Sequence, residues 1–498
     1  MRKKQFFLNI ITSYGAQLVT TICALILPRL ILSAYGSDVN GLVSSITQFL
    51  SVVSITDMGI ALVVQSSLYK PLADKDNDEI SRILVSAQKF YRTIGILLVI
   101  YTAVLCIVYP NTVNTGFDWI YVASLIVILS VDSIFQYFFG ITKSQLIVSD
   151  QKKYITSYSS IIARILNTVV CCALIYMGAS IQIVKLVSAL VFLINPITYS
   201  IYVKRNYSIN WKIKYTTEPI KQKWNGVARH ITSYIFDNTD TIILTFFSTL
   251  ANVSVYAVYN MVLKGINQLV SIFGNVIQPM LGEYWAKEEK DKFNHFFSAY
   301  EWTMQAGGCF IYGCTMTLIV PFVKVYTNNI NDVNYIVPVF AILITLAGAI
   351  QFLRLPYGTV IGSVGLYKET QNYYIATSAL NIVISLLLVY KFDLVGVAIG
   401  TLIASVYMYF SNGQYIYRNI LNKPIKDFAI ITIKSVLIFI IAGTSCSFIE
   451  LWETTFISWI ILAVIHAIIW LATIILINVL FDREKTIMSL KALVALKK

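Results

Sequence analysis

The stretch from Thr455 to Leu480 reads TFISWIILAVIHAIIWLATIILINVL and contains no Asp, Glu, Lys or Arg. As an α-helix it would be about 39 Å long, which is enough to cross the roughly 30 Å hydrocarbon core of a bilayer. An apolar run of this length is too long for a buried strand and shows no strict alternation of polar and apolar residues. The stretch therefore predicts a transmembrane helix.

Similar apolar runs recur along the whole chain. Of its 498 residues, 57% are hydrophobic and only 13% are charged, whereas soluble domains are usually about 25% charged. The composition predicts an all-α integral membrane protein with about fourteen transmembrane helices. The expected spans are 6–33, 40–66, 92–110, 117–141, 154–178, 180–203, 225–249, 254–281, 297–320, 333–360, 371–390, 394–416, 427–449 and 455–480.

Basic residues are distributed unevenly between the predicted connections. With the amino terminus inside, the inward segments hold 29 Lys and Arg residues, while the outward connections hold only Lys324 and Lys391. This pattern predicts a multi-pass protein of the cell membrane with both termini in the cytoplasm. Arg2-Lys3-Lys4 is followed by an apolar run without a small-residue cleavage site, so we expect an uncleaved first span. The net charge of +13 would then face anionic lipid head groups, and no nucleic-acid partner is needed to explain it.

Two halves of the chain are similar. Ile11-Thr12-Ser13-Tyr14 recurs at residues 231–234, and charged loops at 74–79 and 287–292 follow corresponding spans. Because six spans separate the copies, the halves would cross in the same direction, as two bundles related by a pseudo-twofold axis along the membrane normal. Such bundles can enclose a cavity that opens to either side. The expected domains are a six-helix bundle at 1–205, a basic linker at 206–224, a second six-helix bundle at 225–420, and two further helices with a basic tail at 421–498.

Several charged residues lie inside the predicted spans, where each costs about 2.5–3.5 kcal/mol at mid-membrane. Asp57, Asp132 and Arg164 each stand about 11 residues, or roughly 16 Å, from the inner end of their helix. Their common depth predicts a buried network, either structural or involved in binding a ligand or a proton. The Asp, Lys and Arg residues within spans are Arg29, Asp57, Asp132, Arg164, Lys185, Arg229, Asp237, Asp240, Lys264, Arg354 and Lys434.

The second half repeats this pattern of intramembrane charge. Asp237 and Asp240 lie in the seventh span, and Lys264 stands too deep in the eighth for easy snorkelling. Arg354 precedes Pro356, which frees a backbone carbonyl one turn earlier and bends the helix, so both polar groups are expected to face a cavity. Pro28-Arg29 makes a similar pair in the first span.

No motif of catalysis is present. The seven cysteines form no CxxC pair, and the sequence has no metal-ligand spacing, Walker A loop or GxSxG elbow. The outward connections are too short to carry a catalytic domain. We therefore expect neither an enzyme nor a bound metal or cofactor.

The first hundred residues resemble the O-antigen and capsule repeat-unit flippases, the Wzx-like members of the multidrug/oligosaccharidyl-lipid/polysaccharide exporter superfamily. The resemblance lies in Leu27-Pro28-Arg29, in Tyr35 to Leu42 (YGSDVNGL), in Asp57-Met58-Gly59 and in Leu68 to Ala73 (LYKPLA). The fourteen spans and the twofold repeat extend it over the whole chain.

This resemblance implies a transporter that moves undecaprenyl-pyrophosphate-linked oligosaccharide from the cytoplasmic to the outer leaflet. Membrane lipids, a polysaccharide polymerase and other assembly proteins would be its partners. H⁺ or Na⁺ is the candidate coupling ion. The candidate residues for pyrophosphate binding are Arg29, Arg164, Lys264 and Arg354, and those for coupling or for orienting the cations are Asp57, Asp132, Asp237 and Asp240.

Three alternatives remain open. A drug or metabolite antiporter of the same superfamily usually depends on a buried acid, whereas the first span here has Arg29 and no acid. A lipid II flippase is consistent with every feature above. A membrane-embedded polymerase or glycosyltransferase is disfavoured because no sizeable outward loop is present.

Overall fold

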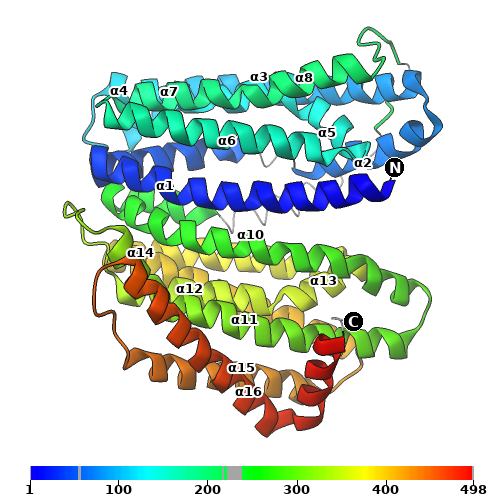
Figure 1. Cartoon of the computed structure of the whole chain (residues 1–498), viewed down its shortest axis with the longest axis vertical. Helices are drawn as coiled ribbons and strands as arrows, with labels where there is room; N and C mark the ends of the chain where they lie inside the picture. The colour runs from blue at the N-terminus through cyan, green and yellow to red at the C-terminus, as the bar shows by residue number, and fades with distance from the viewer. Residues whose placement is uncertain (1, 54–57, 216–217, 221–237, 496–498) are drawn as a thin grey trace. The chain divides into compact units, whose positions relative to one another are not determined.

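The structure is a computed structural model that describes residues 2–53, 58–215, 218–220 and 238–495. Within these residues the regular structure is helical throughout (Figure 1). Ten of the described helical segments are long and apolar enough to cross a membrane. The predicted fold class, an all-α multi-pass membrane protein, is confirmed.

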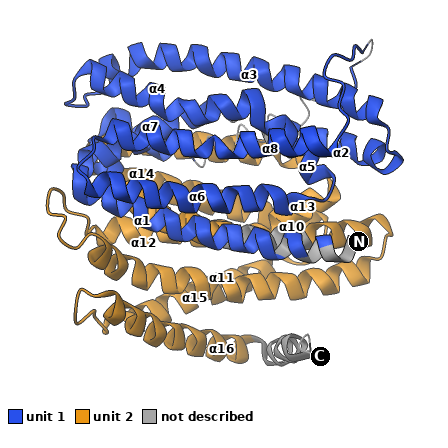
Figure 2. Ribbon diagram, turned by 45° about the horizontal axis from the view of Figure 1, so that its top comes forward, with its two compact units in different colours: residues 1–254 blue, residues 255–498 orange. Residues whose placement is uncertain are grey.

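The chain forms two compact units, residues Met1–Ser254 and Val255–Lys498 (Figure 2). In the first unit α1 packs against α6, α3 against α4, and α4 against α7. Leu42, Ile46 and Tyr91 lie fully buried in its core. The helices that begin and end in this unit are α1 (Arg2–Ser51), α2 (Met58–Asp74), α3 (Asn77–Thr112), α4 (Trp119–Phe135), the π-helix η2 (Gln136–Gly140), α5 (Ile141–Ser149), α6 (Lys153–Tyr176), α7 (Ile181–Phe192), α8 (Ile194–Asn206) and a helix over residues 238–247.

The second unit is built around α11, which packs against α12, α15 and α16. Trp470 and Tyr312 are among its largest fully buried side chains. Its helices are α10 (Leu250–Ala286), α11 (Lys290–Tyr326), α12 (Pro338–Leu353), α13 (Leu355–Val364), α14 (Tyr367–Asn419), α15 (Ile425–Ser447) and α16 (Phe456–Ala495). The first residues of α10, up to Ser254, belong to the first unit.

Residues 238–254 follow the basic linker in sequence but pack in the first unit. Asn40 donates to Ser254 over 2.8 Å, and the hydroxyls of Ser45 and Thr245 are 2.8 Å apart. The contacts therefore divide the chain at Ser254, beyond the linker at 206–224 where the sequence places the division. The reason is that α1 supplies the hydrogen-bond partners of this segment.

Some helix boundaries differ from those expected. The predicted separations near residues 34–39 and 391–393 correspond to sharp kinks at Gly36 (φ 84°) in α1 and Asp393 (φ 45°) in α14. The tenth span was predicted to begin at 333, which is wrong, because α12 begins at Pro338, a residue suited to the first turn of a helix. The last helix continues to Ala495, well past the predicted end at Leu480.

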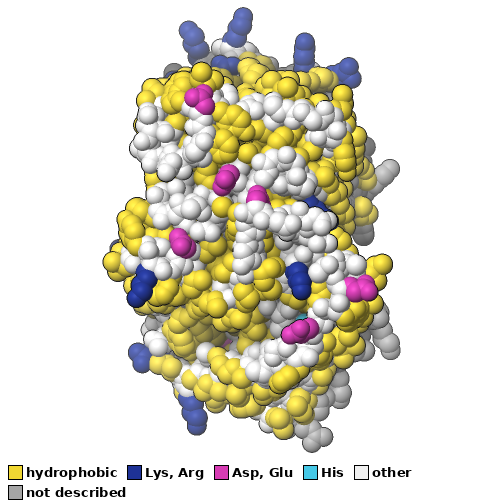
Figure 3. Space-filling model, turned by 90° about the vertical axis from the view of Figure 1, so that its left-hand side faces the viewer, with side chains coloured by type: hydrophobic (Ala, Val, Ile, Leu, Met, Phe, Trp, Pro, Cys, Tyr) yellow, Lys and Arg dark blue, Asp and Glu magenta, His cyan; other side chains and the backbone are white. Residues whose placement is uncertain are grey.

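Large apolar side chains cover much of the surface of both units. On α3, Ile96, Ile100 and Ile107 are 53–62% exposed, and on α16 Ile457 is 73% exposed. Water would disfavour such a surface, whereas lipid tails accommodate it. On the face shown in Figure 3, acidic side chains lie singly among apolar and polar ones, and several Lys and Arg side chains lie along its upper edge. The structure is thus that of a membrane-embedded chain.

Candidate functional site

Asp132 and Arg164 are neighbours inside the first unit. Asp132 lies on α4, and its Oδ1 atom is buried without a hydrogen-bond partner. Arg164 lies on α6, where its Nε donates to Ser160 Oγ over 3.4 Å and its guanidinium stands 6.0 Å from the ring centre of Phe192. Arg164 acts electrostatically on Asp132, but no direct ion pair joins these two described side chains. Of the predicted network, Asp57 lies outside the described residues.

A π-helical turn begins one helical turn after Asp132. The turn η2 spans Gln136–Gly140, and a Cβ atom at Gly140 would displace the end of the Gln136 side chain and lie in tight contact with Pro196. Gln136 and Tyr199 also interact with the carboxyl group of Asp132. Single π-turns within α-helices occur frequently at functional sites. Asp132, Gln136, Arg164 and Tyr199 together form what we call the unit 1 polar cluster.

Arg29 lies half-buried on α1, directly after Pro28. The helix remains continuous at this proline, and its sharp kink occurs at Gly36, two turns later. Arg29 is therefore presented by a regular helix rather than at a break.

Arg354 occupies the break between α12 and α13. Its backbone carbonyl accepts from Tyr357 N at 3.1 Å, so the carbonyl of Leu353 lacks the usual helical donor. Gln305 of α11 supplies a replacement, donating to Leu353 O over 3.2 Å. The Arg354 side chain extends to Tyr374, with 3.5 Å between Nη1 and the hydroxyl oxygen. The helix is thus interrupted where Pro356 predicts a bend. Proline has no N–H for the carbonyl of Phe352, which accepts from Arg354 N instead, and Gln305 binds the next carbonyl, that of Leu353.

Lys264 is exposed on α10, together with Asn267 and Gln268 one turn later. Asn267 also accepts a hydrogen bond from Tyr312. Polar side chains at i, i+3 and i+4 share one face of a helix, and lipid would disfavour such a face. This face of α10 is suited to a water-filled cavity.

Of the two acids expected in the seventh span, the structure describes one. Asp240 is only 4% exposed and lies in the helix over residues 238–247. Asp237 lies outside the described residues.

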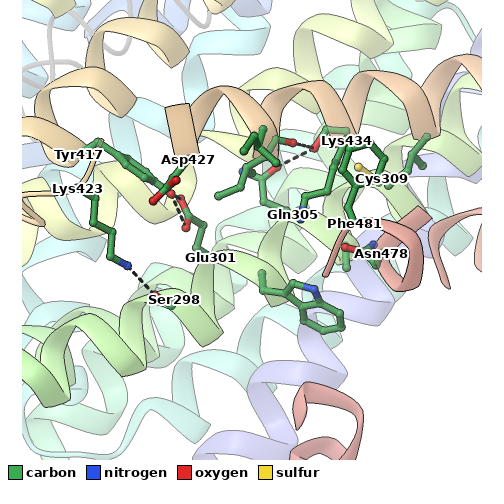
Figure 4. Close-up of a pocket in the computed structure, with 16 residues that line it drawn as sticks. Ser298, Glu301, Gln305, Cys309, Tyr417, Lys423, Asp427, Lys434, Asn478 and Phe481 are labelled. Atoms are coloured by element: carbon green, nitrogen blue, oxygen red, sulfur yellow. Dashed lines mark hydrogen bonds between the residues drawn. The ribbon is translucent and has the colours of Figure 1, made fainter. Parts of the chain in front are cut away.

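A cavity of about 220 Å³ lies in the second unit, between α11, α14, α15 and α16 (Figure 4). Glu301 of α11 is 5% exposed, and both of its carboxylate oxygens accept from the Tyr417 hydroxyl, at 3.0 and 2.9 Å. Lys434 of α15 is 8% exposed, and Lys423 donates to Ser298 over 3.1 Å. Charged side chains of both signs therefore line one partly open cavity.

Sequence reasoning did not assign this cavity. Lys434 was recognised as an intramembrane charge without a role, while Glu301, in the predicted span 297–320, was left out of the set. A count of intramembrane charges that includes Glu would have found it. The pairing of Glu301 with Tyr417, 116 residues away, could not be read from the sequence.

A polar cluster also fixes the turn between α5 and α6. Lys152 forms an ion pair of 2.7 Å with Asp150, which also accepts from the Tyr207 hydroxyl at 2.6 Å. Burial lowers the pKa of Lys152, but the hydrogen bond and the charge of Asp150 outweigh it, and the net shift is upward. Burial and then Asp150 also raise the pKa of Tyr207. The charges of Lys152 and Asp150 neutralise each other within this cluster. The hydrogen bond of Tyr207 joins the turn to the end of α8.

Comparison with solved structures places the fold. An inward-facing multidrug resistance MATE family transporter of the MOP superfamily matches with a TM-score of 0.61 and 10% identity, over 82% of this chain and 98% of that one. An outward-facing transporter of the same description matches with a TM-score of 0.54 and 12% identity, over 82% and 96%. The MATE multidrug transporter DinF-BH matches with a TM-score of 0.52 and 13% identity, over 83% and 95%.

The chain has the fold of these MATE transporters. No family model matches it, and no curated protein sequence does. At 10–13% identity the likeness concerns the fold, and the chemistry of this chain must be argued from its own residues.

The described residues provide charge and hydrogen bonding rather than a metal centre. Among the residues that the structure describes, no group of three or more His, Cys, Asp or Glu side chains could hold a metal ion. What the fold offers is guanidinium, ammonium and carboxylate groups at membrane depth, such as Arg164, Arg354 and Glu301. These groups can bind a charged solute.

Proposed function

We propose that the chain is a flippase that moves a lipid-linked oligosaccharide with a pyrophosphate group from the cytoplasmic to the outer leaflet by alternating access. The observation that carries the proposal is the presence of cations on or between the long helices of each unit. Arg29 and Arg164 lie on α1 and α6 of the first unit, and Lys264 and Arg354 lie on α10 and at the α12–α13 break of the second.

A pyrophosphate group needs such cations. Each charged group inside a membrane is costly, so a residue of this kind is a functional candidate by default. Guanidinium groups bind phosphate oxygens through two parallel hydrogen bonds, and ammonium groups bind them as point charges. Arg354, whose side chain already reaches Tyr374 across to α14, would be positioned for phosphate by that contact. The polyprenyl tail of the cargo can remain in lipid.

A drug or metabolite antiporter is the second candidate, and one observation favours it. The Oδ1 atom of Asp132 is buried without a partner, which is a place for a coupling proton or an organic cation. In the flippase, the unit 1 polar cluster would instead orient Arg164 or bind sugar hydroxyls. The two functions differ in the sign of the cargo's charge.

The test is complementation of a flippase-null strain, with the surface polysaccharide and the accumulated inward-facing lipid-linked repeat unit as readouts. Replacing Arg164, Lys264 or Arg354 with Gln should each reduce flipping roughly 10-fold, because one charge-assisted contact to phosphate is lost. Arg354→Lys should restore only part of the activity, since Lys lacks the bidentate fork.

The matched control is Lys391→Gln, because Lys391 is exposed beside the kink of α14, where its ammonium stands 5.4 Å from the ring centre of Phe392. This variant should flip like the wild type. Lys264→Gln, Arg354→Gln and Lys391→Gln should be as abundant in membranes as the wild type. Arg164→Gln removes the charge that compensates Asp132, so its flipping is expressed per amount of membrane-inserted protein. Full activity of the triple Gln variant would exclude an anionic cargo bound by these cations, and export of cationic drugs by the same variant would favour the antiporter.

A further inference from the structure

The proposed transport of an oligosaccharide does not explain the cavity of the second unit, because the cavity is small and its lining is charged. Its volume of about 220 Å³ is below the roughly 300–1,000 Å³ of pockets that bury drug-sized molecules. An oligosaccharide with a pyrophosphate is larger still. The cavity can therefore hold only a small group or the end of a larger molecule.

The charges of the lining are separated within the cavity. Figure 4 shows Glu301, Tyr417 and Asp427 on one side, and Lys434 and Asn478 on the other. Lys423 lies on the same side as Glu301 and donates to Ser298, so the two acids still leave that side with a net negative charge. A ligand that carries one positive and one negative group can satisfy both sides at once. A ligand with a single charge would leave one side facing a like charge.

Trp302 independently indicates that the cavity binds a ligand. It lines the cavity, and its indole Nε1 is buried without a hydrogen-bond partner. An indole N–H can only donate, and a buried donor left without an acceptor costs about 1–3 kcal/mol. An acceptor in the cavity, such as a phosphate oxygen, would remove this cost.

Part of the lining is apolar and lies beside side chains suited to contact lipid. Ile431, Ile438 and Phe481 face the cavity. On the same helix α15, Ile433 and Ile440 are 54% and 56% exposed, as expected of side chains that contact lipid tails. A molecule that places its head in the cavity could keep its tails along this surface.

We propose that the cavity binds the head group of a zwitterionic phospholipid that carries a phosphate and a primary ammonium, that is, a phosphoethanolamine head group. The ammonium donates to Glu301 and Asp427, while the phosphate accepts from Lys434 and Trp302. The acyl chains lie outside the cavity against α15 and α16. Arg354 is not part of the lining, and the site does not rest on the proposed function.

The test measures lipid binding to the purified full-length chain in detergent by native mass spectrometry. The probes are phosphatidylethanolamine and phosphatidylglycerol with identical acyl chains, together with free phosphoethanolamine. Phosphatidylethanolamine should bind at least roughly 10-fold more tightly than phosphatidylglycerol, because only the former supplies an ammonium to Glu301.

Two variants test the binding of the ammonium and of the phosphate separately. Glu301→Gln retains an acceptor for Tyr417 and should weaken phosphatidylethanolamine roughly 10-fold while leaving phosphatidylglycerol unchanged. Lys434→Gln should weaken both lipids, since both contain the phosphate. The control is Lys426→Gln, an exposed lysine of α15 outside the lining, which should bind both lipids like the wild type.

Equal binding of the two lipids by the wild type would overturn the proposal, as would identical behaviour of the Glu301 and Lys426 variants. Binding of free phosphoethanolamine as tightly as the lipid would overturn the assignment to a lipid. Failure of the transport experiment leaves these outcomes unchanged, because binding is measured without transport.

Discussion

Substitutions of Asp132 can distinguish a structural role of this side chain from a role in transport. Its Oδ1 atom is buried without a partner, while Gln136, Tyr199 and Arg164 interact with the same carboxyl group. Arg164 is bound to Ser160 rather than paired directly with the acid. The carboxylate therefore has spare capacity to accept a proton or a ligand donor, which a closed ion pair would lack.

We predict that Asp132→Asn leaves the amount of protein in membranes within about twofold, because the neutral amide keeps the polar contacts and removes a costly buried charge. Arg164→Leu should strongly reduce abundance, since it leaves the carboxylate without a compensating charge, and Asp132→Asn combined with it should restore abundance. The measurements are immunoblots of membranes and surface polysaccharide, with Asp291→Asn, an exposed acid at the start of α11, as the control.

A structural role predicts that the double variant recovers both abundance and transport, while a role for the carboxylate in cargo or proton binding predicts that abundance alone recovers. If the two substitutions are merely additive in their damage, the side chains are not coupled.

At the scale of elements, the contact between α1 and the start of α10 in the first unit requires a glycine. After its kink at Gly36, α1 crosses the start of α10, where Gly41 lies directly against the carbonyl of Leu250. Hydrogen bonds from Asn40 to Ser254 and between Ser45 and Thr245 hold the same crossing. Small residues permit this close approach of helix backbones within a membrane.

Gly41→Ala should therefore separate α1 from Leu250 and destabilise the protein by about 1–3 kcal/mol, as overpacking usually does. Gly307→Ala is the matched control, because Gly307 also lies inside a helix but has no atom within 4 Å of the place where a Cβ atom would stand. That change should stabilise the protein by about 0.5–1 kcal/mol through its better helix propensity. The measurement is the thermal unfolding midpoint of the purified protein, and equal midpoints for the two variants would show that the crossing is not tightly packed.

For the whole molecule, the length and polarity of the sequence predicted the fold class, since a bilayer requires long apolar helices. The bend near Arg354 was predicted from Pro356, and interruptions near Gly36 and Asp393 were predicted as separations between apolar spans, where the structure has kinks. The cavity around Glu301 could not be predicted, because it arises where four helices distant in sequence pack together. The cargo could not be predicted from the fold either, because one fold can carry different functions.

The orientation of the whole chain is the last prediction, and it rests on the Lys and Arg residues of the connections. In a background without the seven native cysteines, Asp38→Cys, Asn114→Cys and Asp332→Cys should react with an impermeant thiol reagent added to intact cells. Lys75→Cys, Lys212→Cys and Lys287→Cys should react only after the membrane is opened. All six positions are exposed in the structure, so a lack of reaction in intact cells reports the membrane barrier and not burial. Labelling of Lys212→Cys from outside would overturn the orientation, because this residue lies in the basic linker, the segment with the strongest charge signal.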